Sequence, residues 1–205
     1  MICIVDYGVG NIQAFLNLFK RLGVDARRAD SSDALSDAVR LVLPGVGHFD
    51  HAMQQLNDSG MRSKLEELVL GLKVPIVGIC VGMQMLAQGS DEGILPGLNW
   101  VPGHVRAFAK QPQCANLPLP HMGWNELKPQ VGNKLFSKGF EDVPQFYFLH
   151  SYFFEAQYRQ DVAATASYGL DFDAVVSREH IHGVQCHPEK SHHWGEQLLK
   201  NFVEF

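Results

Sequence analysis

The sequence predicts an α/β protein with a central, mostly parallel β-sheet flanked by helices and interrupted by one antiparallel excursion. Two observations support this fold class. Short apolar runs alternate with helix-periodic segments from residue 2 to residue 88, and a Pro- and Gly-rich stretch at 93–129 then breaks the alternation. Strands that alternate with helices favour a parallel sheet covered on both faces. A chain of 205 residues can bury a sizeable core, so we expect a single domain over residues 1–205.

The individual elements follow from apolar periodicity and from the residues that begin and end each segment. In the first half we expect strands at 2–6, 24–30, 41–45 and 74–80, helices at 12–22 and 81–88, and one or two helices within 49–72. Within the excursion, residues 104–109 have a β-like pattern. Strands are then expected within 145–156, 162–169 and 173–187, before a closing helix at 194–205.

Charge and apolar content argue against several function classes. The chain has 17 basic and 22 acidic residues and a net charge of -5, which is not the basic footprint of a nucleic-acid-binding protein. The longest nearly apolar run, 74–87, is too short to span a bilayer, and the N-terminus lacks the features of a signal peptide. We therefore expect a soluble, cytoplasmic protein with no nucleic-acid or membrane partner. The four cysteines are scattered, so structural disulfides are not expected.

One cysteine lies at a predicted bend between a strand and a helix. The run Gly78-Ile79-Cys80-Val81-Gly82 has the layout of a nucleophile elbow with cysteine in place of serine. Glycines two residues before and after leave room for a tight turn. A cysteine at a helix N-terminus faces partial positive charge, which favours the thiolate, and the Val81 N–H would point toward a developing oxyanion. We predict that Cys80 is a nucleophile.

A thiol nucleophile needs a base, and the base needs a group that orients it. His187 and Glu189 follow the last strand-like run, in GVQCHPEKS (183–191). Pro188 favours an extended conformation at His187, and in an extended segment residues two apart share a side. We therefore expect the Glu189 carboxylate to hold the His187 imidazole. The Pro-Gly-Val-Gly loop at 44–47 offers backbone N–H groups for an oxyanion hole.

These pieces together resemble the triad, or class I, glutamine amidotransferases. The resemblance runs almost from end to end through DYGVGNI, LPGVGHF, GICVGMQML, LPHMGWN, FLHSYF and GVQCHPEKS, which occur in the family's order. The motifs PHMGWN and HSY are similar to those of the glutaminase subunits of imidazole glycerol phosphate synthase, which act in histidine biosynthesis.

The resemblance implies a role for each matched residue. Cys80 would attack the amide of L-glutamine, His187 would move the proton to the leaving ammonia, and Glu189 would orient His187. The remaining matched positions are the oxyanion-hole residues Gly45, Val46, Gly47 and Val81 and the glutamine-binding residues Gln84, Ser151 and Tyr152. No cofactor is implied. Glutamine would be hydrolysed through a glutamyl thioester.

The resemblance also implies a partner. No part of the chain is left over to hold an acceptor of ammonia, so we expect a heterodimer with a (βα)8-barrel synthase or cyclase subunit. Asn11 and Lys190 match positions at the docking face. Val81 and Cys186 depart from the usual family pattern, and SHHWGEQLLKNF (191–202) is closer to a paralogous branch. That branch supplies ammonia to an amidine- or acetamidino-sugar synthase of surface polysaccharides, and this alternative changes the acceptor but not the chemistry.

Other kinds of site have weaker support in the sequence. A cluster of possible metal ligands lacks the paired spacing of structural zinc sites, so no metal is expected; its members are His180, His182, Cys186, His187, His192 and His193. Gly8-x-Gly10 lacks the third glycine of a dinucleotide-binding loop. The parallel-sheet rhythm disfavours a papain-like cysteine protease. The alternative from another class, a non-catalytic scaffold subunit, is disfavoured by the intact Cys, His and Glu set.

Overall fold

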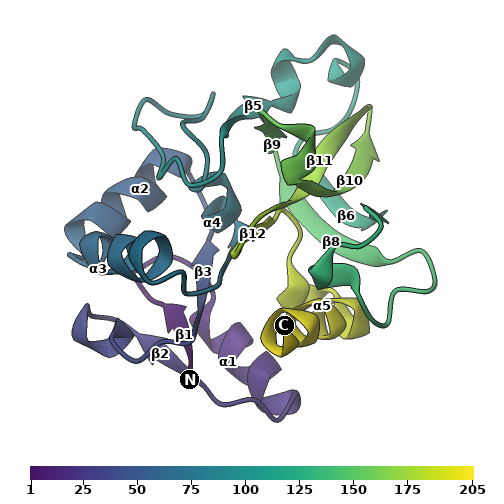
Figure 1. Ribbon diagram of the computed structural model, residues 1–205. Helices are drawn as coiled ribbons and strands as arrows, with labels where there is room; N and C mark the ends of the chain where they lie inside the picture. The colour runs from purple at the N-terminus through teal and green to yellow at the C-terminus, as the bar shows by residue number, and fades with distance from the viewer.

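The computed structural model describes all residues from 1 to 205, and they fold around a ten-stranded mixed sheet (Figure 1). The strands are β1 Ile2–Val5, β2 Ala26–Ala29, β3 Arg40–Gly45, β4 Ile76–Cys80, β5 Gly103–Ala107, β6 His121–Glu126, β7 Lys128–Pro129, β8 Gln145–His150, β9 Tyr152–Ala156, β10 Val162–Tyr168, β11 Leu170–Arg178 and β12 Ile181–Val184. The helices are α1 Ile12–Arg21, α2 Phe49–Asp58, α3 Arg62–Glu66, α4 Val81–Gln84 and α5 His192–Glu204. A π-helical turn, Glu67–Gly71, extends α3.

One half of the sheet is parallel and the other half is antiparallel. Strands β2, β1, β3, β4 and β12 lie side by side and parallel, and β11, β10 and β7 continue the sheet antiparallel. In Figure 1, α2 and α3 lie on one side of the parallel strands and α1 and α5 on the other. Strands β5 and β9 join through β11, and β6 pairs with β8 in a separate two-stranded sheet. The predicted flanked parallel sheet and the antiparallel excursion are both present.

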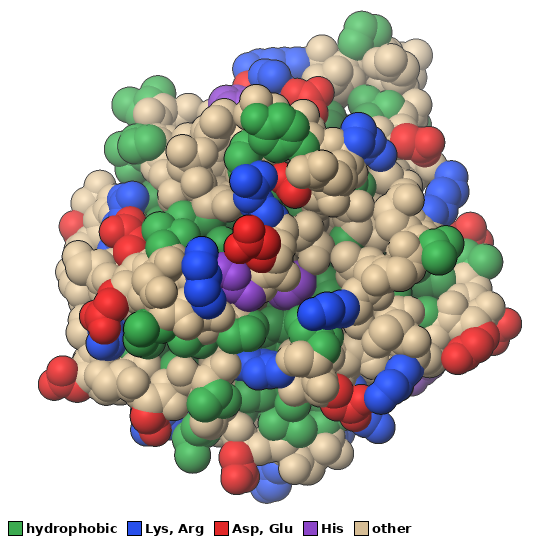
Figure 2. All heavy atoms as spheres, in the orientation of Figure 1, with side chains coloured by type: hydrophobic (Ala, Val, Ile, Leu, Met, Phe, Trp, Pro, Cys, Tyr) green, Lys and Arg blue, Asp and Glu red, His purple; other side chains and the backbone are tan.

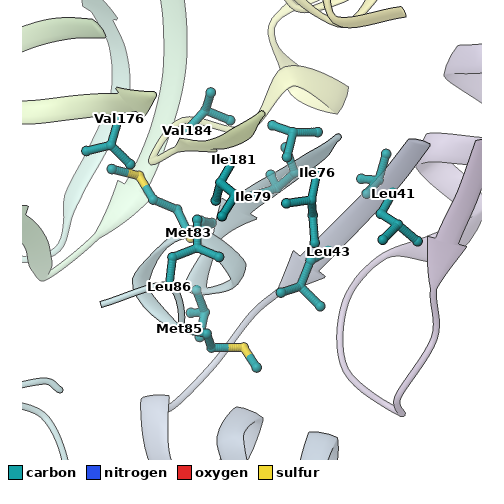
Figure 3. Packing of buried hydrophobic residues seen from close by; sticks show 14 of the residues in the cluster. Leu41, Leu43, Ile76, Ile79, Met83, Met85, Leu86, Val176, Ile181 and Val184 are labelled. Carbon is teal, nitrogen blue, oxygen red and sulfur yellow. The ribbon is translucent and has the colours of Figure 1, made fainter. Parts of the chain in front are cut away.

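The central parallel strands are buried because helices cover both faces of the sheet (Figure 1), whereas the edge strand β2 has the sequence Ala-Arg-Arg-Ala and is partly exposed. All residues of β1, β4 and β12 are buried. Figure 3 shows side chains of β3 and β4, such as Leu43 and Ile79, around those of the turn after β4, such as Met83 and Leu86. This packing belongs to one cluster of 57 buried residues that extends along the chain from Ile2 to Phe202.

The helix after β4 is shorter than the sequence predicts. We expected it to span 81–88, but α4 ends at Gln84. The carbonyl groups of Met85, Leu86 and Ala87 accept hydrogen bonds from backbone N–H groups of 98–101 rather than from a further helical turn. The expectation was wrong because a loop distant in sequence competes for these carbonyls, and local periodicity does not register such a competitor.

Three further features of the structure bear on function: its helices, its surface charges and its cysteines. No helix combines the length and the apolar character needed to cross a membrane. Positive and negative side chains are interspersed on the face that Figure 2 shows, with no broad field of one sign. All four cysteines are free.

The tight turn at Gly82 can be tested by adding a single methyl group. A Cβ at Gly82 would overlap the backbone carbonyl oxygen of Leu43, which cannot move without displacing β3. We expect Gly82→Ala to lower the free energy of unfolding by about 3 kcal/mol, the upper range for overpacking. Urea denaturation measures this change. Gly71→Ala is the control, because a Cβ there meets nothing within 4 Å. Equal stability of Gly82→Ala and the wild type would contradict the close contact.

Candidate active site

The nucleophile candidate Cys80 is the last residue of β4 and has a left-handed backbone, with φ 54° and ψ -111°. Such a conformation is uncommon for a residue other than glycine and clusters at functional sites. The two flanking glycines allow it, because a Cβ at Gly78 would lie 2.5 Å from the Gly82 carbonyl oxygen. The predicted elbow is therefore present in the backbone. However, α4 is a single turn, so the helix dipole contributes less to the site than the sequence suggested.

The strand register brings the other candidate segments to the same edge of the sheet. Gly45 at the end of β3 pairs with Cys80, and Val184 at the end of β12 pairs with Ile79. In a parallel sheet the carboxyl ends of adjacent strands form a crevice that suits a ligand. The 44–47 loop and the residues after Val184 therefore emerge on either side of Cys80.

His187 is held by its backbone and by its ring. Its N–H donates to the Tyr147 carbonyl at 2.9 Å, and its own carbonyl accepts from the Ser191 hydroxyl at 2.7 Å. The ring atom Nδ1 lies 2.8 Å from Glu189 Oε1, which leaves Nε2 to face away from the carboxylate. The predicted contact is present and His187 is extended, as expected. The segment does not stay extended through Glu189, however, because Pro188–Lys190 forms a 3-10 turn.

The charges around His187 decide its protonation state. Burial disfavours the imidazolium, but hydrogen bonds with the Cys80 sulfur and the Glu189 carboxylate, and the negative charges of both groups, outweigh burial. Together they raise the pKa of His187 to about 10. The side chains of His187 and Glu189 are each only 5% exposed, so water screens this pair weakly. A pKa raised in this way favours the protonated form of His187 at neutral pH.

Cys80 and His187 line the same cavity, which has a volume of about 320 Å³. Most of the other predicted site residues line it as well: Val46, Gly47, Val81, Gln84, Ser151, Tyr152 and Lys190. Three do not. Gly45 is inside the sheet against the elbow, Glu189 lies behind His187, and Asn11 caps α1 by accepting from the Ala14 N–H at 3.3 Å.

Four further residues line the cavity and were missed by the sequence reasoning: Glu92, Pro120, Leu149 and His150. Glu92 is the only acidic residue among the lining residues, and its Oε2 accepts from the Phe49 N–H at 2.8 Å. That bond ties the loop after α4 to the start of α2. The segment around Glu92 carries no motif. Leu149 and His150 lie in the motif FLHSYF, directly before the predicted site residue Ser151. That motif could therefore have indicated both residues.

His150 belongs to a buried pair of neutral histidines. Its Nδ1 donates to the Tyr152 carbonyl at 2.8 Å, so its Nε2 accepts from His121 Nδ1 at 2.9 Å. Asn125 donates to the far nitrogen of His121 at 3.2 Å. Burial, together with the charges of His121 and His187, lowers the pKa of His150 to about 3, and burial lowers that of His121 to about 4. The site thus holds a charged imidazole beside an uncharged one.

The histidines of the alternative metal site make separate contacts. His180 Nε2 lies 2.7 Å from the Val69 carbonyl, and His182 Nδ1 lies 2.8 Å from the Ser177 hydroxyl. Burial, with a smaller contribution from Glu189, raises the pKa of Cys186 well above its usual value, so this thiol is neutral. No three His, Cys, Asp or Glu side chains are arranged to hold a metal ion.

Comparisons with known proteins identify the class. The family profile described as glutamine amidotransferase class-I matches residues 3–205, so the chain belongs to the class I glutamine amidotransferases. A crystal structure of a glutamine amidotransferase has the same fold, with a TM-score of 0.75 at 17% identity over 99% of this chain and 97% of that chain. The structure of PurLQS from Thermotoga maritima gives a TM-score of 0.72 at 16% identity, over 98% of this chain and 96% of the matched chain.

Curated relatives of higher sequence identity show which subfamily of the class I enzymes the chain belongs to. Imidazole glycerol phosphate synthase subunit HisH of Bdellovibrio bacteriovorus is 58% identical over 204 residues, which is 100% of both chains. The HisH subunit of Leptospira borgpetersenii is 46% identical over 99% of both chains, and HisH 2 of Pseudomonas aeruginosa is 43% identical over 100% of this chain and 99% of that one. Within class I the chain belongs to the HisH subunits of imidazole glycerol phosphate synthase. The predictions of the fold class, of an enzyme and of this family are confirmed.

The charge pairing in the site makes a prediction about pH. Glu189→Gln removes the negative charge that keeps His187 protonated, so the pKa of His187 falls and less thiolate is held at neutral pH. We expect the rate of alkylation of Cys80 by iodoacetamide at pH 7 to fall about 10-fold, and the rise of that rate to move to higher pH. Mass spectrometry of the Cys80 peptide from pH 5 to pH 10 measures the profile. Glu196→Gln, at a remote carboxylate that pairs with Arg21, is the control. Superimposable profiles for Glu189→Gln and wild type would count against the pairing.

Proposed function

We propose that this chain hydrolyses L-glutamine to glutamate and ammonia with Cys80, His187 and Glu189, and passes the ammonia to a synthase subunit in histidine biosynthesis. The observation that carries the proposal is the meeting of Cys80 and His187 in one cavity, with Glu189 bonded to His187 at 2.8 Å, in a chain of the class I family. The names of the full-length relatives favour imidazole glycerol phosphate synthase over the polysaccharide paralogue. We take residues 1–205 to act as one glutaminase domain.

In this proposal the Cys80 thiolate attacks the side-chain amide carbon of glutamine and forms a tetrahedral intermediate. The His187 imidazolium donates its proton to the nitrogen, and ammonia leaves as the glutamyl thioester forms. Neutral His187 then takes a proton from water, whose oxygen attacks the thioester. Collapse of the second intermediate releases glutamate, and the proton returns to the His187–Cys80 pair. Glu189 holds the ring in the orientation that both proton transfers need.

The oxyanion would be stabilised by the backbone on two sides of Cys80. We assign this role to the Val81 N–H and to the Val46 and Gly47 N–H groups of the loop after β3. Gly47 has φ 81°, a conformation that favours glycine, and Val46 is 43% exposed, so the outer side of the loop faces solvent. Gly45, which the cavity does not reach, contributes by supporting the elbow rather than by touching substrate.

The polar lining fits the two charged ends of an amino acid. The carbonyls of Ser151 and Tyr152 already accept bonds within the protein, from the Phe108 N–H and from Gln84 and His150. The Tyr152 carbonyl is therefore fully engaged, while the Ser151 carbonyl keeps one lone pair. The α-ammonium group of glutamine has three N–H donors, so it needs a further acceptor. Glu92 supplies one, as the only acidic side chain in the lining, while the Ser151–Tyr152 loop and Gln84 complete the binding site.

The partner in this proposal docks over the mouth of the cavity. Free ammonia is mostly protonated at pH 7 and then is no nucleophile, so it must reach its acceptor without meeting bulk water. Exposed apolar side chains next to the cavity residue Pro120 suit a docking face, and Leu119, Met122 and Trp124 are 37%, 64% and 46% exposed. We assign Lys190, which lines the cavity, and Asn11 to the same interface, and we propose a (βα)8 barrel as the partner's fold.

The proposed reaction is tested by glutamate release from glutamine. We expect Cys80→Ala to reduce turnover by at least about 1000-fold in the presence of the co-purified synthase partner, because no other group supplies the nucleophile. Cys114→Ala, which removes another buried cysteine, should leave turnover unchanged. Identification of the co-purified partner separates the histidine synthase from a polysaccharide synthase. Turnover that survives in Cys80→Ala, or is absent with the cognate partner, would favour the scaffold alternative.

Glu92 gives a separate prediction about substrate affinity. Glu92→Gln keeps an oxygen for the Phe49 N–H but loses the charge that faces the α-ammonium group. We expect KM for glutamine to rise about 10-fold with little change in kcat, as for the loss of one charged hydrogen bond. Steady-state kinetics with the partner measure both constants, and Glu67→Gln at an exposed carboxylate is the control. An unchanged KM would assign the ammonium group to another acceptor.

A further inference from the structure

We propose that Gln185 is a further catalytic residue, whose side-chain amide donates an N–H to the Cys80 sulfur and stabilises its thiolate. This inference rests on the proposed function, because it concerns the same nucleophile. The mechanism proposed above, with Cys80, His187 and Glu189, gives no role to Gln185, which lies between β12 and His187.

The sheet register delivers Gln185 to this position. Val184 pairs with Ile79, so the residues that follow them, Gln185 and Cys80, lie beside each other. The Gln185 N–H donates to the Ala174 carbonyl at 2.8 Å, which fixes the backbone against β11. The side chain is fully buried, with 0% exposure. A buried amide needs hydrogen-bond partners, and here one of them is the nucleophile.

The hydrogen-bond chain determines which end of the amide faces the sulfur. The Tyr152 backbone carbonyl can only accept, so the atom of Gln84 that lies 3.2 Å from it is the Nε2 donor. The same Nε2 lies 3.1 Å from the Gln185 side chain, which must therefore present its oxygen there. The other end, the Gln185 Nε2, then faces Cys80 Sγ at 3.6 Å. One backbone carbonyl thus sets the direction of the whole chain and places a donor on the sulfur.

A donor at this place favours the charged form of the sulfur. Hydrogen bonds to ionised groups are stronger than neutral ones, and the burial of both partners keeps water from competing. The sulfur then receives an N–H from Gln185 as well as the interaction with His187. The chain also restricts Gln84, whose two amide hydrogens are both used inside the protein. Gln84 can offer substrate only its carbonyl oxygen.

The experiment compares Gln185→Met, which keeps the length but has no donor, with Gln185→Glu, which places an acceptor against the sulfur. The rate of Cys80 alkylation by iodoacetamide is measured from pH 5 to pH 10 by mass spectrometry. We expect Gln185→Met to slow alkylation at pH 7 about 10-fold and to move the rise of the profile up by about one pH unit. Gln185→Glu should move it further in the same direction.

Gln197→Met is the matched control, since it removes a side-chain amide on α5 that bonds only Asn201, and its profile should match the wild type. Superimposable profiles of Gln185→Met and wild type, or faster alkylation in Gln185→Glu, would overturn the proposal. Alkylation needs no glutamine, so this result is independent of whether the chain proves to be a glutaminase.

A measurement on the wild-type protein covers the case in which these variants do not fold. With glutamine side chains labelled with ¹⁵N, the Gln185 amide resonance is assigned through its contact with the Gln84 amide. We expect it to shift with the same pH midpoint as Cys80 alkylation and to stay constant over that range in Cys80→Ser. An amide resonance that does not respond while Cys80 ionises would refute the proposal.

Discussion

The close approach between the β3 backbone and the turn at Gly82 is the constraint on which the site depends. Only a residue without a side chain fits at Gly82 against the Leu43 carbonyl, and the same turn holds Cys80 at φ 54°. With the backbone so fixed, the sulfur is directed out of the sheet rather than into the core around Ile79. The left-handed conformation costs of order 1–3 kcal/mol, which the surrounding buried cluster offsets.

The electrostatic design contrasts two imidazoles that lie close together. His187 is buried beside negative partners and is protonated, whereas His150 is buried beside other histidines and is neutral. Burial on its own would lower the pKa of both rings. The charges and hydrogen bonds around each ring therefore decide why the pKa of His187 is raised and that of His150 is lowered. Such a separation of pKa values assigns roles: the charged ring can move a proton at the sulfur, and the neutral one can only orient the loop that it bonds at the Tyr152 carbonyl.

Local features of the sequence were enough to predict the tight turn at Cys80 and the contact between His187 and Glu189. The glycines around Cys80 and the short interval from His187 to Glu189 are properties of neighbouring residues, so a single sequence displays them. Glu92 and Gln185 were missed because their importance arises from contacts across the fold. Glu92 reaches the start of α2, and Gln185 reaches Cys80 over 105 positions of the chain through the register of two strands. The predicted helix at 81–88 was wrong for the same reason, since the loop at 98–101 takes its carbonyls.

The size and charge of the cavity explain why such a chain needs a second subunit. A volume of about 320 Å³ is at the small end of ligand sites, which suits an amino acid with an ammonium and a carboxylate group rather than a phosphorylated sugar beside it. The residues that line it carry one acidic side chain, Glu92, one exposed lysine, Lys190, and the imidazolium of His187, whose charge is paired with Glu189. They do not form a cluster of free basic groups that would hold phosphate. The nitrogen must therefore be used at another place. Because ammonia is captured by protons in open water, in our proposal the acceptor lies next to the cavity, under a partner surface that covers its mouth.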